Sequence, residues 1–292
     1  MGRSRSLIFI PGNNQRFLEK SRTIDSDIIC YDLEDSVPQE EKEIARKSIR
    51  SVIQEIYKID DDANKERILA VRINSPTSDQ IITDLKKVIT PGIDAIVIPK
   101  VNDDKQIAEI SGIIEKEEKA KNIQSGIIKI IPSIESALGV VNAYNIAKSD
   151  QRITTLVFGI FDFLHDMKID NQDIETITGF MYGRAKVPVD ARAAGIDSID
   201  SIWQDIHDHS GLIKDLDLGK KMGYNGKCII HPAQIEHVHN AFSASTQDIE
   251  WAKKVVQALD SAKKNSSGAV KLEGKMVDAV HYKQAKRILD SI

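Results

Sequence analysis

The sequence predicts an α/β protein in which a closed (β/α)8 barrel is followed by a C-terminal helical arm. Eight short apolar segments begin near residues 6, 28, 68, 95, 127, 154, 198 and 226 of the 292-residue chain. Their average spacing of about 31 residues is that of one strand followed by one helix. The segments are apolar throughout rather than alternating, which is typical of parallel strands covered on both faces.

The predicted strands, in chain order, occupy residues 7–10, 28–31, 68–71, 95–98, 127–131, 156–158, 199–203 and 228–230. Amphipathic segments between them predict helices, among them residues 40–56, 78–89, 104–121, 136–148 and 179–194. An open, doubly wound sheet gives the same local pattern, but eight strand and helix units favour closure into a TIM barrel.

The pattern changes after Phe242, and this change predicts two domains. Residues 1–244 are expected to form the catalytic barrel, and residues 245–292 the arm. Within the arm the sequence predicts a long helix at 246–264, a break at 265–268, a short strand at 269–272 and a closing helix from Asp278.

Composition and charge exclude several classes of partner. The chain has 40 Lys and Arg against 44 Asp and Glu, without blocks of like charge, so we expect no nucleic-acid partner. No apolar stretch approaches the roughly 18 residues of a membrane helix. Cys30 and Cys228 both lie in apolar strands, which predicts buried free thiols and a reducing compartment. We therefore expect a cytoplasmic protein that acts on small molecules, with no membrane partner.

Charged residues follow several predicted strands, at the end of the barrel where such folds place their chemistry. Glu34 and Asp35 follow the second strand, Glu135 the fifth and Asp162 the sixth, whereas Arg72 and Lys100 end the third and fourth. A single carboxylate at such a place could simply cap the next helix. Carboxylates at neighbouring strand ends are the oxygen ligands that Mg²⁺ prefers, so a divalent metal site is the sharper hypothesis.

Other site motifs are absent from the sequence. It contains no phosphate-binding G-x-x-x-x-G-K-[ST], no dinucleotide-binding G-x-G-x-x-G and no zinc-binding H-E-x-x-H. His231 follows the last strand and precedes Pro232. This position suits either a ligand contact or a structural hydrogen bond at the rim of the barrel.

Several motifs together resemble the citrate lyase beta-subunit family of the HpcH/HpaI aldolases, and they span nearly the whole chain. The resemblance is carried by the segments 5–14, 32–37, 71–74, 98–100, 134–139, 161–167, 197–203, 223–227 and 274–278.

The resemblance implies a (β/α)8 barrel that assembles as a homotrimer and cleaves or forms a carbon–carbon bond in a hydroxy-acyl thioester with Mg²⁺. By resemblance, the Mg²⁺ ligands are Glu135 and Asp162. Arg72 corresponds to the arginine that contacts substrate or thioester oxygen. Asp278 corresponds to an acid that the C-terminal arm places over the site of a neighbouring subunit.

These roles suit the chemistry of citryl thioester cleavage. Asp278 is the candidate base for the tertiary hydroxyl, and Arg72 meets the negative charge that develops on the thioester oxygen. Glu135 and His231 are further candidates for substrate binding. Glu34 and Asp35 are expected to orient waters bound to the metal.

The thioester carrier stays open between acyl carrier protein and coenzyme A. The sequence Phe161-Asp162-Phe163 is similar to true citrate lyase, which would imply a carrier-protein thioester and the alpha and gamma subunits as partners. Ile230-His231-Pro232 is more similar to relatives that act on coenzyme A esters. Alternatives are a malyl-CoA or citramalyl-CoA lyase, a thioesterase on the same metal site, and a non-catalytic regulatory paralogue.

Overall fold

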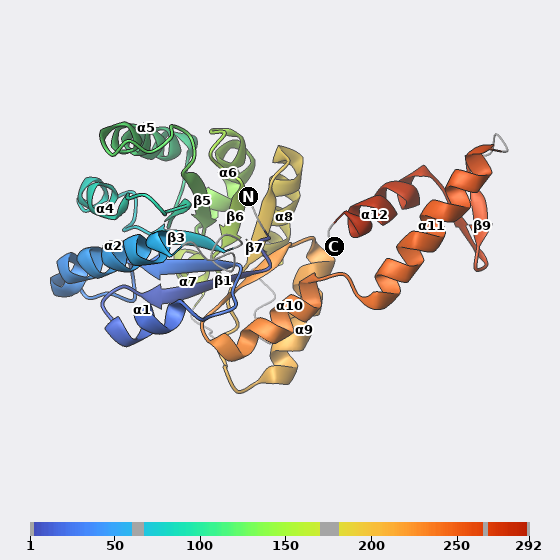
Figure 1. Ribbon diagram of the computed structural model, residues 1–292, viewed down its shortest axis with the longest axis horizontal. Coiled ribbons are helices and arrows are strands. Elements are labelled where there is room, and N and C mark those ends of the chain that lie inside the picture. The colour runs from blue at the N-terminus through green and yellow to red at the C-terminus, as the bar shows by residue number, and fades with distance from the viewer. Residues whose placement is uncertain (1–2, 60–66, 170–180, 265–267, 291–292) are drawn as a thin grey trace. The chain divides into compact units, whose positions relative to one another are not determined.

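The structure is a computed structural model that describes residues 3–59, 67–169, 181–264 and 268–290. Within these residues, eight parallel strands follow one another in chain order and close into a barrel through pairing of the first with the last (Figure 1). The predicted (β/α)8 TIM barrel is therefore confirmed. Its strands are β1 (Ser6–Pro11), β2 (Ile28–Asp32), β3 (Ile68–Arg72), β4 (Ala95–Ile98), β5 (Lys129–Ile134), β6 (Thr155–Phe158), β7 (Asp197–Asp200) and β8 (Gly226–Ile229).

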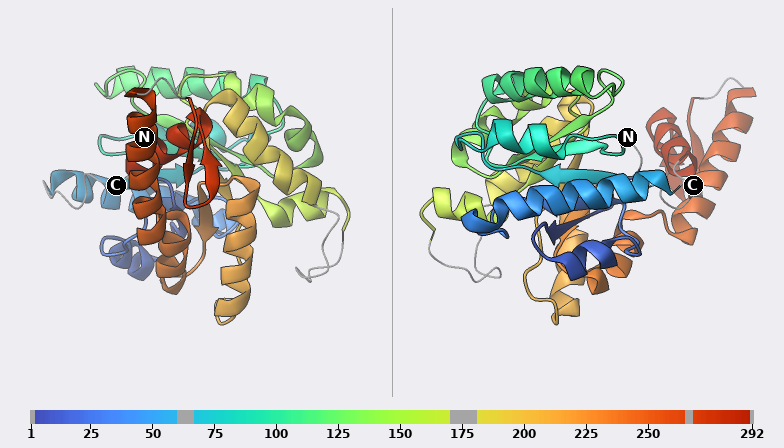
Figure 2. Two further views of the ribbon diagram at one scale, coloured as in Figure 1. Left: turned by 90° about the vertical axis from the view of Figure 1, so that its right-hand side faces the viewer. Right: turned by 60° about the vertical axis from the view of Figure 1, so that its left-hand side comes forward.

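Helices follow the strands and lie around the outside of the barrel, as Figure 2 shows from two further directions. They are α1 (Gln15–Ser21), α2 (Lys42–Lys58), α4 (Ile81–Val88), α5 (Asp104–Ala120), α6 (Ala137–Lys148), α7 (Ile160–Asp166), α8 (Met181–Ala194), α9 (His209–Met222) and α10 (Ile235–Phe242). Two short 3₁₀ helices, η1 (Gln39–Glu41) and η2 (Pro232–Gln234), precede α2 and α10. The predicted helix start at residue 179 lies outside the described residues.

Helix α2 illustrates why these segments pack as they do. Its buried side chains include Ala45, Ile49, Val52, Ile53 and Ile56, at the spacing of three and four residues that forms one face of a helix. That face packs inward, and of the charged side chains of α2 only Lys42 and Arg46 are buried with it.

The interior of the barrel is filled by apolar side chains that alternate along the strands. Leu7, Ala70, Val97, Ile131 and both cysteines belong to this core. Cys30 and Cys228 are buried free thiols, as their apolar surroundings in the sequence predict. This apolar core fills the barrel beneath the carboxyl ends of its strands.

A buried ionic cluster joins β7 and β8 to the helices outside them. The Arg184 guanidinium of α8 lies 2.5 Å from the Asp200 carboxylate of β7, and the Lys227 ammonium of β8 lies 2.5 Å from Asp215 of α9. Burial alone would raise the pKa of Asp200, but Lys227 and Arg184 hold it below its usual value. The cluster satisfies charges that would otherwise be costly to bury.

The seventh strand differs from its prediction. It begins at Asp197 and ends at Asp200, whereas the sequence pattern indicated residues 199–203. Ile202 and Trp203 follow the strand: Ile202 lines a pocket above the barrel, and Trp203 is buried, with its carbonyl accepting a hydrogen bond of 3.1 Å from the Gln234 side chain.

The chain divides into two compact units, Met1–Ala241 and Phe242–Ile292. The second unit contains α11 (Thr246–Lys264), β9 (Val270–Leu272), β10 (Lys275–Val277) and α12 (Ala279–Leu289) around a small core of its own. Strand β10 was not predicted, and it pairs with β9 as an antiparallel hairpin. The predicted break at 265–268 lies largely outside the described residues. Among the helices described, none is long and apolar enough to cross a membrane.

Candidate active site

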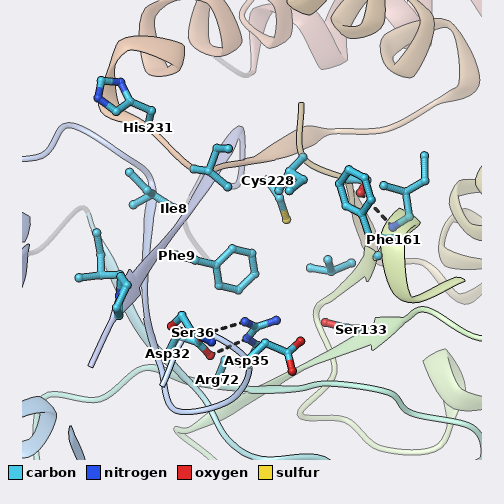
Figure 3. Close-up of a pocket in the computed structure, with 18 of the residues that line it drawn as sticks. Ile8, Phe9, Asp32, Asp35, Ser36, Arg72, Ser133, Phe161, Cys228 and His231 are labelled. Atoms are coloured by element: carbon cyan, nitrogen blue, oxygen red, sulfur yellow. Dashed lines mark hydrogen bonds and ion pairs between the residues drawn. The ribbon is translucent and has the colours of Figure 1, made fainter. Parts of the chain in front are cut away.

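A pocket of about 660 Å³ opens at the carboxyl ends of the strands. Residues from or just after β1, β2, β3, β5, β6, β7 and β8 line it, including the predicted site residues Asp35, Arg72, Glu135, Asp162 and His231. Figure 3 shows the Arg72 guanidinium beside Asp32, Asp35 and Ser36 on one side of this pocket, with His231 on the opposite side. The first unit by itself therefore brings five of the predicted residues around one cavity.

Arg72 is held by Asp32, which the sequence analysis did not single out. The two residues pair at the last position of β3 and β2, and the Asp32 carboxylate accepts hydrogen bonds of 2.7 Å from both Nε and Nη2 of Arg72. The Phe9 ring lies 4.6 Å from the guanidinium carbon. Burial alone would raise the pKa of Asp32, but Arg72 and the Ser36 hydroxyl hold it below its usual value.

Glu135 is buried at the end of β5, where little can move it. Its Oε1 accepts a hydrogen bond of 2.6 Å from the backbone N–H of Lys100. Gly159 packs so closely on the other oxygen that any side chain there would collide with Glu135. Burial, together with the nearby charges of Asp162 and Glu34, raises the pKa of Glu135 to about 8.

Lys100 lies among three carboxylates, two that follow β2 and one in α7 after β6. Its Nζ is 2.7 Å from Glu34, 3.3 Å from Asp162 and 3.4 Å from Asp35. Burial alone would lower the pKa of the Lys100 amine, but these carboxylates raise it. The expected grouping of Glu34 and Asp35 beside the site is thus present, but both face an ammonium.

Glu34 connects the two cations of the site. Its Oε2 lies 3.1 Å from Nη1 of Arg72 and accepts no hydrogen bond from any described residue. The Glu34 pKa is raised, chiefly by burial. Glu34 therefore already has a cation beside each of its two carboxylate oxygens.

The donor set fits a divalent metal ion. Five carboxyl groups, Asp32, Glu34, Asp35, Glu135 and Asp162, gather near two cations, Arg72 and Lys100. Within the described part of the chain, no three His, Cys, Asp or Glu side chains already converge on one point. Mg²⁺ does not need such a cage, because it is commonly bound by one or two carboxylates with water and substrate as its other ligands. Glu135 and Asp162 supply that number.

Of the other predicted positions, His231 lies exposed at the rim of the pocket, and Asp278 belongs to the second unit. His231 is the N-cap residue of η2, where its Nδ1 accepts a hydrogen bond of 3.2 Å from the backbone N–H of Ala233. It therefore makes a rim hydrogen bond and also lines the pocket. Asp278 caps the first turn of α12 in the second unit and forms a capping box with His281.

The sequence analysis missed the roles of Asp32 and Lys100, although both carried a signal. Asp32 and Arg72 are the last residues of two strands that are neighbours in a barrel, so their side chains point to the same end. Lys100 was noted as a cation at a strand end, but not as the partner of Glu34, Asp35 and Asp162.

Comparisons with known proteins agree with these features. The family described as HpcH/HpaI aldolase/citrate lyase matches residues 5–232. Citrate lyase subunit beta of Haemophilus influenzae is 32% identical over 289 residues, covering 98% of this chain and 96% of its own. A (3S)-malyl-CoA thioesterase of Cereibacter sphaeroides is 29% identical over 289 residues, covering 98% of this chain and 93% of its own.

A solved structure has the same fold. It is CitE from Mycobacterium tuberculosis in complex with magnesium, acetoacetate and coenzyme A, which superposes with a TM-score of 0.77 at 23% identity. The match covers 99% of this chain and 98% of that one. The similarity thus extends over both units of the chain.

Proposed function

Because the chain belongs to the HpcH/HpaI aldolase/citrate lyase family, and is therefore a lyase, we propose that it cleaves a citryl thioester to oxaloacetate and an acetyl thioester with the help of Mg²⁺. The observation that carries this proposal is the pairing of a buried acid, Glu135, with Asp162 beside the fixed guanidinium of Arg72. The reaction needs a metal ion at the oxygens of the keto acid, which the two acids would hold, and a positive charge at the thioester oxygen, which Arg72 would supply.

The proposed reaction breaks one carbon–carbon bond. A base takes the proton of the tertiary hydroxyl, the hydroxyl carbon becomes the keto carbon of oxaloacetate, and the bonding electrons form the enolate of the acetyl thioester. Protonation of that enolate gives the product. Arg72 faces the developing enolate charge. Its two hydrogen bonds to Asp32 keep the guanidinium in one orientation before that charge appears.

Glu135 and Asp162 would hold the metal ion. When bound, Mg²⁺ supplies a Lewis acid for the oxygens of the keto acid. The M. tuberculosis structure contains magnesium, and the donor set of this chain supports extending that to the present protein. Glu135 and His231 are proposed to contact substrate, with His231 on the side of the pocket away from Arg72.

Asp278 is proposed as the base, supplied by the arm of a neighbouring subunit in a trimer. His281 and the N–H of Val280 lower the pKa of Asp278 in the single chain, which makes it a weak base. Burial under the barrel of a neighbour would raise that pKa and strengthen the base. The proposal therefore links catalysis to assembly.

The thioester carrier is proposed to be either an acyl carrier protein or coenzyme A. Full-length similarity to a citrate lyase beta subunit supports a carrier-protein thioester and association with alpha and gamma subunits. The 29% identical thioesterase supports a second candidate function, hydrolysis of a malyl or citramalyl thioester at the same site. Retention of Arg72, Glu135 and Asp162 around one pocket argues against a non-catalytic paralogue.

One assay separates these functions. Citryl, malyl and citramalyl thioesters, each on coenzyme A and on a carrier protein, are incubated with the protein and Mg²⁺, and the products are identified. A lyase yields a 2-oxo acid and a shortened acyl thioester, whereas a thioesterase yields the intact hydroxy acid and a free thiol. Glu135→Gln and Asp162→Asn should abolish either reaction. No turnover of any thioester by the folded, metal-loaded protein would contradict the proposal.

A further inference from the structure

Lys100 contacts both of the residues that the proposed function assigns to the metal. Its backbone N–H donates to Glu135 at 2.6 Å, and its Nζ lies 3.3 Å from Asp162. Its backbone has a left-handed conformation, with a φ of 54°. Residues other than glycine seldom adopt this conformation, and where they do the strain is often associated with function.

The Lys100 ammonium also has two carboxylates that the metal does not require. Glu34 lies 2.7 Å from Nζ and Asp35 lies 3.4 Å away. An ammonium that left Asp162 would therefore still have two anionic partners within reach of a small side-chain movement. Lys100 is not among the residues that line the pocket, so its charge acts on the site from the side.

An ammonium and a divalent cation compete for the same carboxylate. Like charges separated by a few ångströms in a partly buried site repel strongly, because the protein screens them less than water does. Without the metal, however, the ammonium offsets the mutual repulsion of Glu34, Asp35 and Asp162. The same side chain thus stabilises the metal-free site and opposes metal binding.

We propose that Lys100 is an internal counter-ion of the metal site, which holds Asp162 before the metal binds, moves toward Glu34 and Asp35 when it binds, and so sets the affinity for the divalent cation. The proposal rests on the proposed function for the assignment of Glu135 and Asp162 to the metal. It gives Glu34 and Asp35 a role as acceptors of the displaced ammonium.

The test is a titration of the purified full chain with Mn²⁺, followed by calorimetry and by electron paramagnetic resonance of free Mn²⁺. Lys100→Met preserves the length of the side chain and removes its charge. We expect it to bind Mn²⁺ at least tenfold more tightly than wild type. Lys105→Met is the matched control, because it removes the same charge from an exposed position on α5 and should leave the affinity unchanged within about twofold.

Two further variants make the result interpretable. Asp162→Asn should abolish the tight binding of Lys100→Met when the two changes are combined. Lys100→Asn is the alternative if Lys100→Met does not fold, because asparagine tolerates the left-handed backbone. Thermal unfolding gives a second measurement: in a chelator Lys100→Met should unfold at a lower temperature than wild type, and Mn²⁺ should raise its midpoint by more.

The outcomes distinguish this proposal from the proposed function. If Mn²⁺ binding depends on Asp162 but the folded Lys100 variants bind Mn²⁺ no more tightly than wild type, the proposed role of Lys100 is wrong and the metal assignment stands. If Asp162→Asn does not weaken Mn²⁺ binding, or if neither wild type nor any variant binds Mn²⁺, the metal assignment is wrong and this inference fails with it. Binding that appears only in the Lys100 variants and requires Asp162 supports the competition.

Discussion

Asp32 and Arg72 face each other at the last paired position of β2 and β3, and two hydrogen bonds of 2.7 Å join the carboxylate to the Nε and Nη2 atoms of the guanidinium. Such a bidentate pair fixes the plane of the guanidinium as well as its position. With its guanidinium carbon also 4.6 Å from the centre of the Phe9 ring, Arg72 is oriented before substrate arrives. Preorganised charge of this kind stabilises a transition state without the cost of reorientation.

The first prediction concerns the geometry of this pair. Arg72→Lys keeps the charge but cannot bond both oxygens of Asp32 in one plane. We expect kcat for thioester cleavage to fall by roughly 10²- to 10³-fold, with a smaller change in KM, because enolate charge appears only in the transition state. Steady-state kinetics provide the measurement. A change confined to KM would make Arg72 a residue that binds substrate and transition state equally.

Asp32 serves as the partner test for the same prediction. Asp32→Asn should lower kcat in the same way, because it releases the guanidinium from its fixed plane. If the two residues act as a unit, the double variant Asp32→Asn with Arg72→Lys should be little worse than Arg72→Lys alone. Fully additive losses would mean that Asp32 acts on the reaction separately from Arg72.

The second prediction is a pH dependence of stability in the metal-free protein. The pKa of Glu135 is raised to about 8 by burial and by Asp162 and Glu34, whereas an unfolded glutamate titrates near its ordinary 4.5. Between these values the folded state binds more protons than the unfolded state, so the Glu135 contribution to stability falls as pH rises. Urea unfolding in a chelator, from pH 5 to pH 9, measures this slope.

Glu135→Gln isolates the contribution of this carboxyl group. Glutamine imitates the neutral acid, so the variant should gain stability relative to wild type as pH rises from 5 to 8. Mg²⁺ at pH 8 should stabilise wild type and have little effect on the variant. A stability difference that stays constant across this pH range would show that Glu135 does not titrate there.

The third prediction concerns Gly159, which lies against Glu135. A Cβ on residue 159 would lie 2.8 Å from the Cβ of Glu135 and closer still to its Oε2. Gly159→Ala should therefore displace Glu135 and weaken Mn²⁺ binding by at least tenfold. Gly112→Ala is the control, because a Cβ there meets no atom within 4 Å and the residue lies inside α5.

We expect this control to stabilise the protein by about 0.5–1 kcal/mol, as alanine does in a helix interior, with metal affinity unchanged. Calorimetric Mn²⁺ titration and urea unfolding distinguish the two variants. If Gly159→Ala bound metal as tightly as wild type, the position of Glu135 would not depend on the close approach of Gly159.

Most of the fold was predictable, because continuous apolar segments and their spacing depend only on local sequence. The predictions of secondary structure failed where tertiary contacts determine which residues form a strand. Ile202 and Trp203 resemble strand residues in the sequence, but the strand ends at Asp200. Ile202 instead lines the pocket, and the Trp203 carbonyl accepts a hydrogen bond from Gln234. Strand β10 has only three residues, and Met276 in its middle is exposed, so its apolar pattern is weak.

A turn signal could have located that hairpin. Glu273 and Gly274 both have positive φ, of 49° and 84°, as a two-residue hairpin loop requires, and Gly274 is the visible part of this signal. In the site, the rule that chemistry follows strand ends identified Arg72, Glu135 and Asp162. It could not identify the contacts of Lys100, because these join residues that follow β2, β5 and β6 and so depend on the tertiary structure.

The last prediction tests whether Asp278 acts in catalysis or only caps a helix. In the structure it caps α12, where its Oδ1 accepts a hydrogen bond of 3.0 Å from the N–H of Val280. Asparagine caps a helix about as well as aspartate, so Asp278→Asn should fold normally while losing the proposed base. Equal stability of Asp278→Asn and wild type in urea is the control for the experiment that follows.

Inactive Asp278→Asn subunits are then mixed with inactive Glu135→Gln subunits, dissociated and reassembled. If one subunit supplies the barrel and its neighbour the arm, some sites in the mixed oligomer combine an intact Glu135 with an intact Asp278. Activity should return only in the mixture and should depend on the ratio of the two variants. Full activity of Asp278→Asn alone would show that Asp278 caps α12 and is not the base. An inactive variant without rescue in verified mixed oligomers would restrict Asp278 to the site of its own chain.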